Sequence, residues 1–141
     1  MINVFKCQLY KDIINKELIP AMGCTEPVAI AFCAAKAKSY LKDMPEKVIV
    51  ETSGNIIKNA KSVIVPNTKG MKGIEVAAAM GIVSGDPSLG LEVISQADEK
   101  SIDQVKAFMK ETKIEVKTAE QSALLDINVT LIHQDHKVSV R

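Results

Sequence analysis

The stretch that decides the fold is EPVAIAFCAAKAKSYL, which runs from Glu26 to Leu41. It is almost wholly apolar through Ala35. A helix that is hydrophobic around most of its circumference is usually buried, so we expect a buried helix over this stretch. Thr25 is a suitable N-cap, and Glu26 and Pro27 suit the first turn, where both a carboxylate and a proline fit.

The segments on either side predict more helices and several short strands. Ile74–Ser84 is dense in small apolar residues and predicts a closely packed helix, which the turn Gly85-Asp86-Pro87 ends. The other predicted helices are Val4–Leu18, Leu89–Gln96 and Ser101–Thr112, and the predicted strands are Lys47–Thr52, Val63–Val65, Ile114–Thr118, Leu124–Ile132 and Lys137–Val140. Helices dominate the first two-thirds and a small, mainly antiparallel sheet follows, so the predicted class is α+β.

The length and composition suit a globular protein with a core of its own. The chain has 141 residues, of which 47% are hydrophobic and 25% are charged. We divide it into a motif-bearing region of helices and strands, residues 1–97, and a helix followed by three strands, residues 98–141. The alternative is that both regions form one compact domain.

The charge balance excludes several classes of partner. Eighteen basic residues against seventeen acidic ones give a net charge of +1, so no field of one sign attracts a polyanion. Three Phe, two Tyr and no Trp leave no platform for stacking bases. Residues 1–10 lack the pattern of a signal peptide, and the apolar run Val28–Ala35 is too short to cross a bilayer. We therefore expect a cytoplasmic protein that binds neither nucleic acid nor membrane.

Among the three cysteines, Cys24 has the neighbourhood of a reactive or metal-binding residue. Their odd number and uneven spacing fit neither a disulfide framework nor a zinc site. Cys24 directly precedes the expected helix, where backbone amides and the helix dipole favour a thiolate, the form that binds metals or attacks substrates. The alternative is that Cys24 is merely a small buried residue. Cys7 and Cys33 lie on helices full of core residues, which favours packing.

Polar residues gather in two later clusters. Ser53-Gly54-Asn55 predicts a turn, and Lys58-Asn59 follows. Their hydroxyl, amide and amine groups suit the carboxylate of a small substrate, although Ser and Asn in turns usually bond their own backbone. The second cluster, Asn67-Thr68-Lys69-Gly70, offers backbone amides to an anion but lacks the spacing of a P-loop. His133 and His136 predict a solvated hairpin rather than a metal site.

Several of these stretches resemble the amino-terminal motifs of the L-cysteine desulfidase family, which is related to the alpha chain of the iron–sulfur L-serine dehydratases. The motif-bearing stretches are Ala21–Ile30, Ser53–Asn59, Val65–Thr68 and Gly70–Glu75, the last continued by Ala77–Gly81. They follow one another in the family's order over roughly residues 15–95. The most specific part is Gly-Cys-Thr-Glu-Pro followed by Ser-Gly-Asn, and beyond Ser101 the resemblance is general.

This resemblance implies a [4Fe–4S] lyase that acts on L-cysteine or L-serine by β-elimination and gives pyruvate and ammonia. In the family, three cysteines hold the cluster, and one iron stays open to bind the substrate as a Lewis acid. Carried over, Cys24 is one ligand of the metal cluster. Thr25, Ser53, Asn55 and Asn59 hold the amino-acid carboxylate and amine, and the catalytic base is not identified.

The chain departs from the family in its length. Family members are considerably longer, and their other cluster cysteines lie in a carboxy-terminal half to which Cys7 and Cys33 do not correspond. We therefore expect an amino-terminal fragment or subunit that is inactive and holds no cluster alone, needs a carboxy-terminal half or partner chain, and self-associates through bare apolar surface. The alternative is an amino-acid- or anion-binding module, or an interaction domain, without catalysis.

Overall fold

The buried helix that the sequence predicts is the first element of the fold. The computed structural model describes residues 25–119 and 126–141, so the predicted helix Val4–Leu18 lies outside the described residues. Helix α2 covers Thr25–Leu41 and helix α4 covers Ile74–Ser84. The other elements are β1 (Lys47–Thr52), α3 (Gly54–Ala60), the 3-10 helix η1 (Pro87–Glu92), α5 (Glu99–Glu111), β2 (Lys113–Thr118), β3 (Ile127–His133) and β4 (His136–Val140). The α+β class is confirmed.

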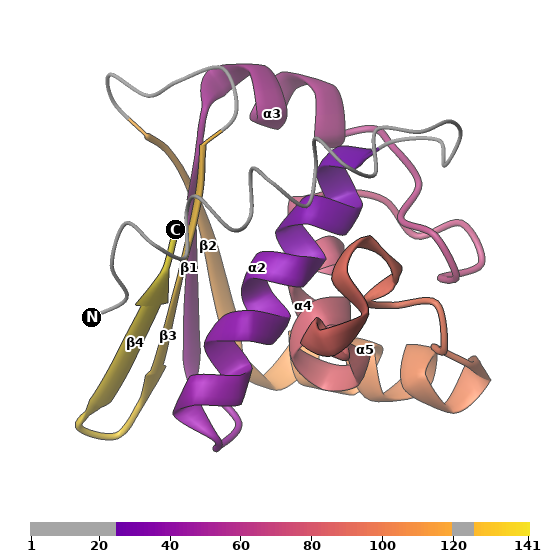
Figure 1. The fold of residues 1–141 in the computed structure, drawn as a ribbon. Helices are drawn as coiled ribbons and strands as arrows, with labels where there is room; N and C mark the ends of the chain where they lie inside the picture. Colours follow the sequence, from indigo (N-terminus) through magenta and orange to yellow (C-terminus); the bar gives the residue numbers. More distant parts are fainter. Residues whose placement is uncertain (1–24, 120–125) are drawn as a thin grey trace.

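The four strands form one mixed sheet with the order β2-β1-β3-β4. Strand β1 pairs in parallel with β2, where Lys47 lies opposite Lys113, and antiparallel with β3, where Lys47 lies opposite Ile132. Strands β3 and β4 form an antiparallel hairpin closed by His133 and His136. Helices α2, α4 and α5 lie on one face of this sheet (Figure 1). Two of the three strand pairings are antiparallel, as predicted.

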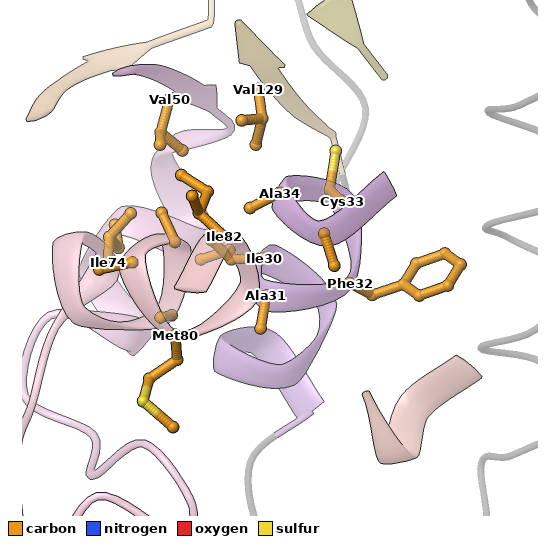
Figure 2. Close-up of a cluster of buried hydrophobic side chains, with 14 of the residues drawn as sticks. Ile30, Ala31, Phe32, Cys33, Ala34, Val50, Ile74, Met80, Ile82 and Val129 are labelled. Atoms are coloured by element: carbon orange, nitrogen blue, oxygen red, sulfur yellow. The ribbon is translucent and has the colours of Figure 1, made fainter. Parts of the chain in front are cut away.

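The core lies between the sheet and helices α2 and α4. In β1, buried and half-buried residues alternate, so Val48, Val50 and Thr52 share the face that the helices cover. Figure 2 shows Val50 pointing from the sheet toward Ile30 of α2 and Ile82 of α4. Ile30 is fully buried. The apolar residues of α2 and α4 are therefore buried because each helix has the sheet on one side and the other helix on another.

Helices α2 and α4 touch through their backbones at one glycine. A Cβ atom added at Gly81 would lie on the carbonyl oxygen of Ala31 and 2.8 Å from its carbonyl carbon. Real Cβ atoms essentially never come that close to another heavy atom. One turn later, a Cβ at Gly85 would lie 2.9 Å from the Cβ of Ala35. The small residues of both helices are thus what allows them to pack at this distance.

Two local predictions between the helices are wrong. Only Ser53 of the predicted turn lies outside a helix, because α3 begins at Gly54 and buries Ile56 and Ala60, which are four positions apart and share a helix face. The predicted strand Val63–Val65 is reduced to a single bridge between Ile64 and Lys72. The chain turns back there because Asn67, Lys69 and Gly70 adopt positive φ angles.

The segments around α5 follow the predictions more closely. The predicted short helix Leu89–Gln96 is displaced to η1, whose N-cap Asp86 accepts a 3.0 Å hydrogen bond from the Ser88 amide. Helix α5 begins with a capping box in which Asp98 accepts from the Ser101 amide at 2.9 Å. Hydrogen bonds from that amide and from the Ser101 hydroxyl hold the pKa of the Asp98 carboxyl below its usual value. Asp98–Lys100 is therefore a solvated helix start, as predicted.

One hydrophobic cluster joins the two predicted regions. It contains Ile30, Val50 and Met80 from residues 1–97 and Val105 and Val129 from residues 98–141. The division into two regions stays a prediction. Over the ranges 25–119 and 126–141, no helix is long and apolar enough to cross a membrane.

Candidate functional site at the carboxyl end of β1

The carboxyl end of β1 is where the fold gathers most of the polar residues that the sequence singles out. Strand β1 ends at Thr52, Ser53 follows, and α3 begins directly after it. Helix α3 lies at the same end of the sheet as the first turn of α2 (Figure 1). This proximity results from the short connection between Leu41 and Lys47, which makes α2 and β1 run in opposite directions.

Ser53 forms the base of this region. It is only 3% exposed, and its amide donates to the carbonyl oxygen of Asp126 at 3.0 Å, which ties the start of α3 to the start of β3. Its own carbonyl oxygen accepts from the Ile57 amide at 3.1 Å, so Ser53 is the N-cap of α3. Its side chain makes no capping hydrogen bond. Ser53 is thus fixed by its backbone between the sheet and the helix.

The other predicted site residues lie at different depths. Asn55 and Asn59 are exposed and four positions apart on α3, so their amides share one solvent-facing side of that helix. Thr25 is the first residue of α2. Cys24, the predicted cluster ligand, lies outside the described residues. The fold therefore brings Ser53, Asn55 and Asn59 together on one short segment and places the start of α2 at the same end of the sheet.

Three residues at this end were missed in the sequence. Thr52 is fully buried, and its Oγ1 has no hydrogen-bond partner in the described part of the chain. Asp126 and Arg141 form a forked ion pair, with Nε to Oδ1 at 2.9 Å and Nη2 to Oδ2 at 2.5 Å. Asp126 is 8% exposed, so Arg141 neutralises a nearly buried carboxylate. The alternation of β1 could have identified Thr52, but the ion pair depends on the β3–β4 register.

The second polar cluster forms a tight loop. Thr68 is 1% exposed, and its hydroxyl donates to the Val65 carbonyl at 2.6 Å and accepts from the Met71 amide at 3.1 Å. The side-chain amide of Asn67 donates to the carbonyl of Ile94 at 3.0 Å. Lys69 pairs with Glu99. These side chains hold the loop together, and an anion on its backbone amides stays a prediction.

The described residues do not fit an iron–sulfur cluster by themselves. Cys33 is 2% exposed, and its thiol donates to the carbonyl oxygen of Val140 at 3.1 Å, which confirms a packing role. Within residues 25–119 and 126–141, no three His, Cys, Asp or Glu side chains are grouped as a metal site. His136 is exposed, and the Nδ1 atom of His133 lies 2.9 Å from the Met44 carbonyl oxygen, so the two histidines close the hairpin of β3 and β4.

Comparison with known proteins finds relatives that are named UPF0597 proteins. A protein of Desulfitobacterium hafniense named UPF0597 is 51% identical over 134 residues, which are 95% of this chain and 31% of that protein. Over this part, the chain is similar to the UPF0597 proteins. A UPF0597 protein of Finegoldia magna is 50% identical over 85% of this chain and 29% of its own length, and one of Treponema denticola is 42% identical over 89% and 29%.

The comparisons also limit which properties of the relatives can be assigned to this chain. The chain spans about a third of the length of the curated relatives that it matches. The names of these relatives state no activity, substrate or cofactor. No family model matches the chain. No solved structure matches it.

Proposed function

We propose that this chain is the amino-terminal, substrate-side part of a [4Fe–4S]-dependent lyase that acts on L-cysteine or L-serine. The observation that carries the proposal is the position of Ser53, Asn55 and Asn59 on one segment, at the same end of the sheet as the start of α2. These residues belong to the motifs that resemble the L-cysteine desulfidases. Their chemical types suit an amino acid, whose charged groups need both donors and acceptors.

Each proposed residue has a role that its chemistry supports. The amides of Asn55 and Asn59 offer donors and acceptors on the exposed side of α3. Ser53 comes just before α3, and Thr25 is the first residue of α2, a longer helix whose dipole favours a negatively charged carboxylate at its start. Cys24, one residue before α2, is the proposed iron ligand. The remaining ligands and the catalytic base come from outside the described residues.

The proposed reaction is a β-elimination that balances without an external oxidant. The substrate loses its α-proton, and its β-thiol or β-hydroxyl leaves as hydrogen sulfide or water. The resulting aminoacrylate reacts with water and gives pyruvate and ammonia. Because the chain spans about a third of its relatives, we expect this reaction only when the remaining part is supplied.

The test is to produce this chain together with the remainder of the Desulfitobacterium hafniense relative, and to reconstitute the mixture anaerobically with iron and sulfide. We expect absorbance near about 400 nm, and pyruvate from L-cysteine or L-serine. Neither part alone should give either signal. Cys24→Ala should abolish both signals, and Cys33→Ala, which changes a core cysteine, is the matched control.

Three results would contradict the proposal in different ways. If the mixture forms a cluster but gives no pyruvate from either amino acid, the proposed lyase activity is wrong. If the absorbance of the cluster is still present in Cys24→Ala, Cys24 is not the iron ligand. A cluster on the isolated chain would show that its own residues complete the cage, and the proposed dependence on a second part would be wrong.

A further inference from the structure

Thr52 carries a polar group that the fold buries and leaves without a partner among the described residues. The residue is fully buried, and its Oγ1 makes no hydrogen bond there. Its backbone, in contrast, takes part in the sheet, where Thr52 lies opposite Thr118 of β2 and Ile127 of β3, and its carbonyl oxygen accepts from the Ala119 amide at 2.9 Å. A buried hydroxyl without a partner costs about 1–3 kcal/mol, so such groups are uncommon in folded proteins. The position therefore calls for a functional explanation.

The side chain of Thr52 faces the helices at the end of β1. Residues two apart on a strand share a face, and Val50 points toward Ile30 of α2 (Figure 2). Thr52 lies about 7 Å further toward the carboxyl end on the same face. Helix α2 runs in the opposite direction to β1, so its first turn lies at that end as well (Figure 1). The side chain of Thr52 is thus on the face that adjoins the region between the end of β1 and the starts of α2 and α3.

Helix α3 follows directly on this end of β1, and few of its residues are buried (Figure 1). It has only seven residues. Of these residues only Ile56 and Ala60 are buried. Helices this short have little stability of their own, and segments with few buried contacts open most easily. A displacement of α3 is therefore the movement that would let a ligand reach the end of β1.

We propose that the Thr52 hydroxyl binds the ligand directly, by donating a hydrogen bond to the carboxylate of an α-amino acid that enters under α3. This inference rests on the proposed function, because it takes the ligand from it and adds a binding residue at the same end of the sheet. Asn55 and Asn59 lie on the exposed side of α3, so they reach a ligand held by Thr52 only when α3 is displaced. A charged acceptor is the partner that a desolvated hydroxyl favours most. The positive end of the seventeen-residue helix α2 lies at the same end of the sheet and adds to the attraction for a carboxylate.

The experiment is a calorimetric titration of the 141-residue chain with L-serine, comparing the unchanged chain with Thr52→Val, Thr52→Ser and Thr130→Val. Thr52→Val should weaken L-serine binding about tenfold or more, since it removes a hydrogen bond to a charged group. Thr52→Ser keeps the hydroxyl and should bind like the unchanged chain. Thr130 is a matched control, because it is also buried in the sheet but its hydroxyl bonds Ser139 at 2.8 Å.

A second readout separates a ligand-binding hydroxyl from a structural one. Without ligand, Thr52→Val should leave the thermal midpoint unchanged or raise it, since no hydrogen bond is lost. Thr130→Val should lower the midpoint and leave L-serine binding unchanged. The proposal is overturned if Thr52→Val lowers the midpoint as Thr130→Val does, or if it binds L-serine as tightly as the unchanged chain.

The failure of this inference can be told apart from the failure of the proposed function. If the unchanged chain does not bind L-serine, Thr52 is not a binding residue of this chain, whereas pyruvate formation in the reconstituted mixture still decides whether the lyase proposal holds. If L-serine binds and Thr52→Val does not change its affinity, the chain has a binding site to which Thr52 does not contribute. If Thr52→Val alone weakens binding, the hydroxyl is part of the site.

Discussion

The contact between α2 and α4 and the segment from Ser53 to Gly73 solve the same problem of close packing by different means. At the first, Gly81 sits against the backbone of Ala31, and nearly every neighbour is apolar. The second turns the chain with positive φ angles at Asn67, Lys69 and Gly70 and with side-chain hydrogen bonds to the backbone. The volume of the side chains determines how α2 packs against α4, whereas hydrogen-bond geometry determines the path of the chain from Ser53 to Gly73.

This difference has a functional meaning. A region determined by volume has one tight arrangement, because interiors are packed as densely as crystals. A region held by a few hydrogen bonds and a seven-residue helix can open at smaller cost. The candidate site residues Ser53, Asn55 and Asn59 all belong to the second region. The substitutions below test whether the two regions differ as described.

The largest effect is expected at the helix contact. Gly81→Ala places a Cβ on the Ala31 carbonyl, which cannot yield as a flexible side chain would. Forcing the helices apart should lower the free energy of unfolding by about 3 kcal/mol, measured by urea denaturation. A loss below about 1 kcal/mol would mean that this contact is adaptable, and the contrast between the two regions would fail.

A smaller effect is expected at the centre of the loop. Thr68→Val removes the hydroxyl that bonds Val65 and Met71, so two backbone groups lose their partner. The free energy of unfolding should fall by about 2 kcal/mol. Thr68→Ser keeps the hydroxyl and should recover most of this loss. Equal stability of the Val and Ser variants would show that packing, not hydrogen bonding, determines the loop.

The ion pair beside Ser53 should contribute slightly less. Arg141→Ala leaves the nearly buried Asp126 carboxylate without its fork and should cost about 1.5 kcal/mol in urea denaturation. Arg141→Lys keeps the charge but cannot form two parallel bonds, so it should recover only part of the loss. If Arg141→Lys restored the full free energy of unfolding, the charge alone, and not the forked geometry, would account for the stabilisation.

The smallest effect, of opposite sign, is expected at the start of α3. A Cβ at Gly54 would meet no atom within 4 Å, so Gly54→Ala adds helix propensity without a clash. It should stabilise the chain by about 0.5 kcal/mol. The same substitution type thus has opposite effects at Gly54 and Gly81. If thermal midpoints fell in both variants, the space around α3 would be as restricted as the space around α4.

The sequence predicts the region of α2 and α4 better than the segment from Ser53 to Gly73. Helices α2 and α4 and strand β1 were placed correctly, because their apolar content and spacing determine them. The segment from Ser53 to Val65 was predicted as a turn and a strand, since the burial of Ile56 and Ala60 under α3 depends on tertiary contacts. The site residues on α3 were named from their motif, but the isolated hydroxyl of Thr52 appears only once the strands are paired. Cys24 stays a prediction.

The order of the strands has a consequence for the newly made chain. Strand β1 is synthesised early, yet its two partners, β2 and β3, come from the last third of the sequence. On the ribosome, the helices that follow β1 can fold while the strand itself still exposes unpaired amides and carbonyls on both sides. Contacts this distant in sequence form late, and an unpaired strand edge invites pairing with another chain. Slow translation beyond α3 should therefore lengthen the period in which nascent chains aggregate.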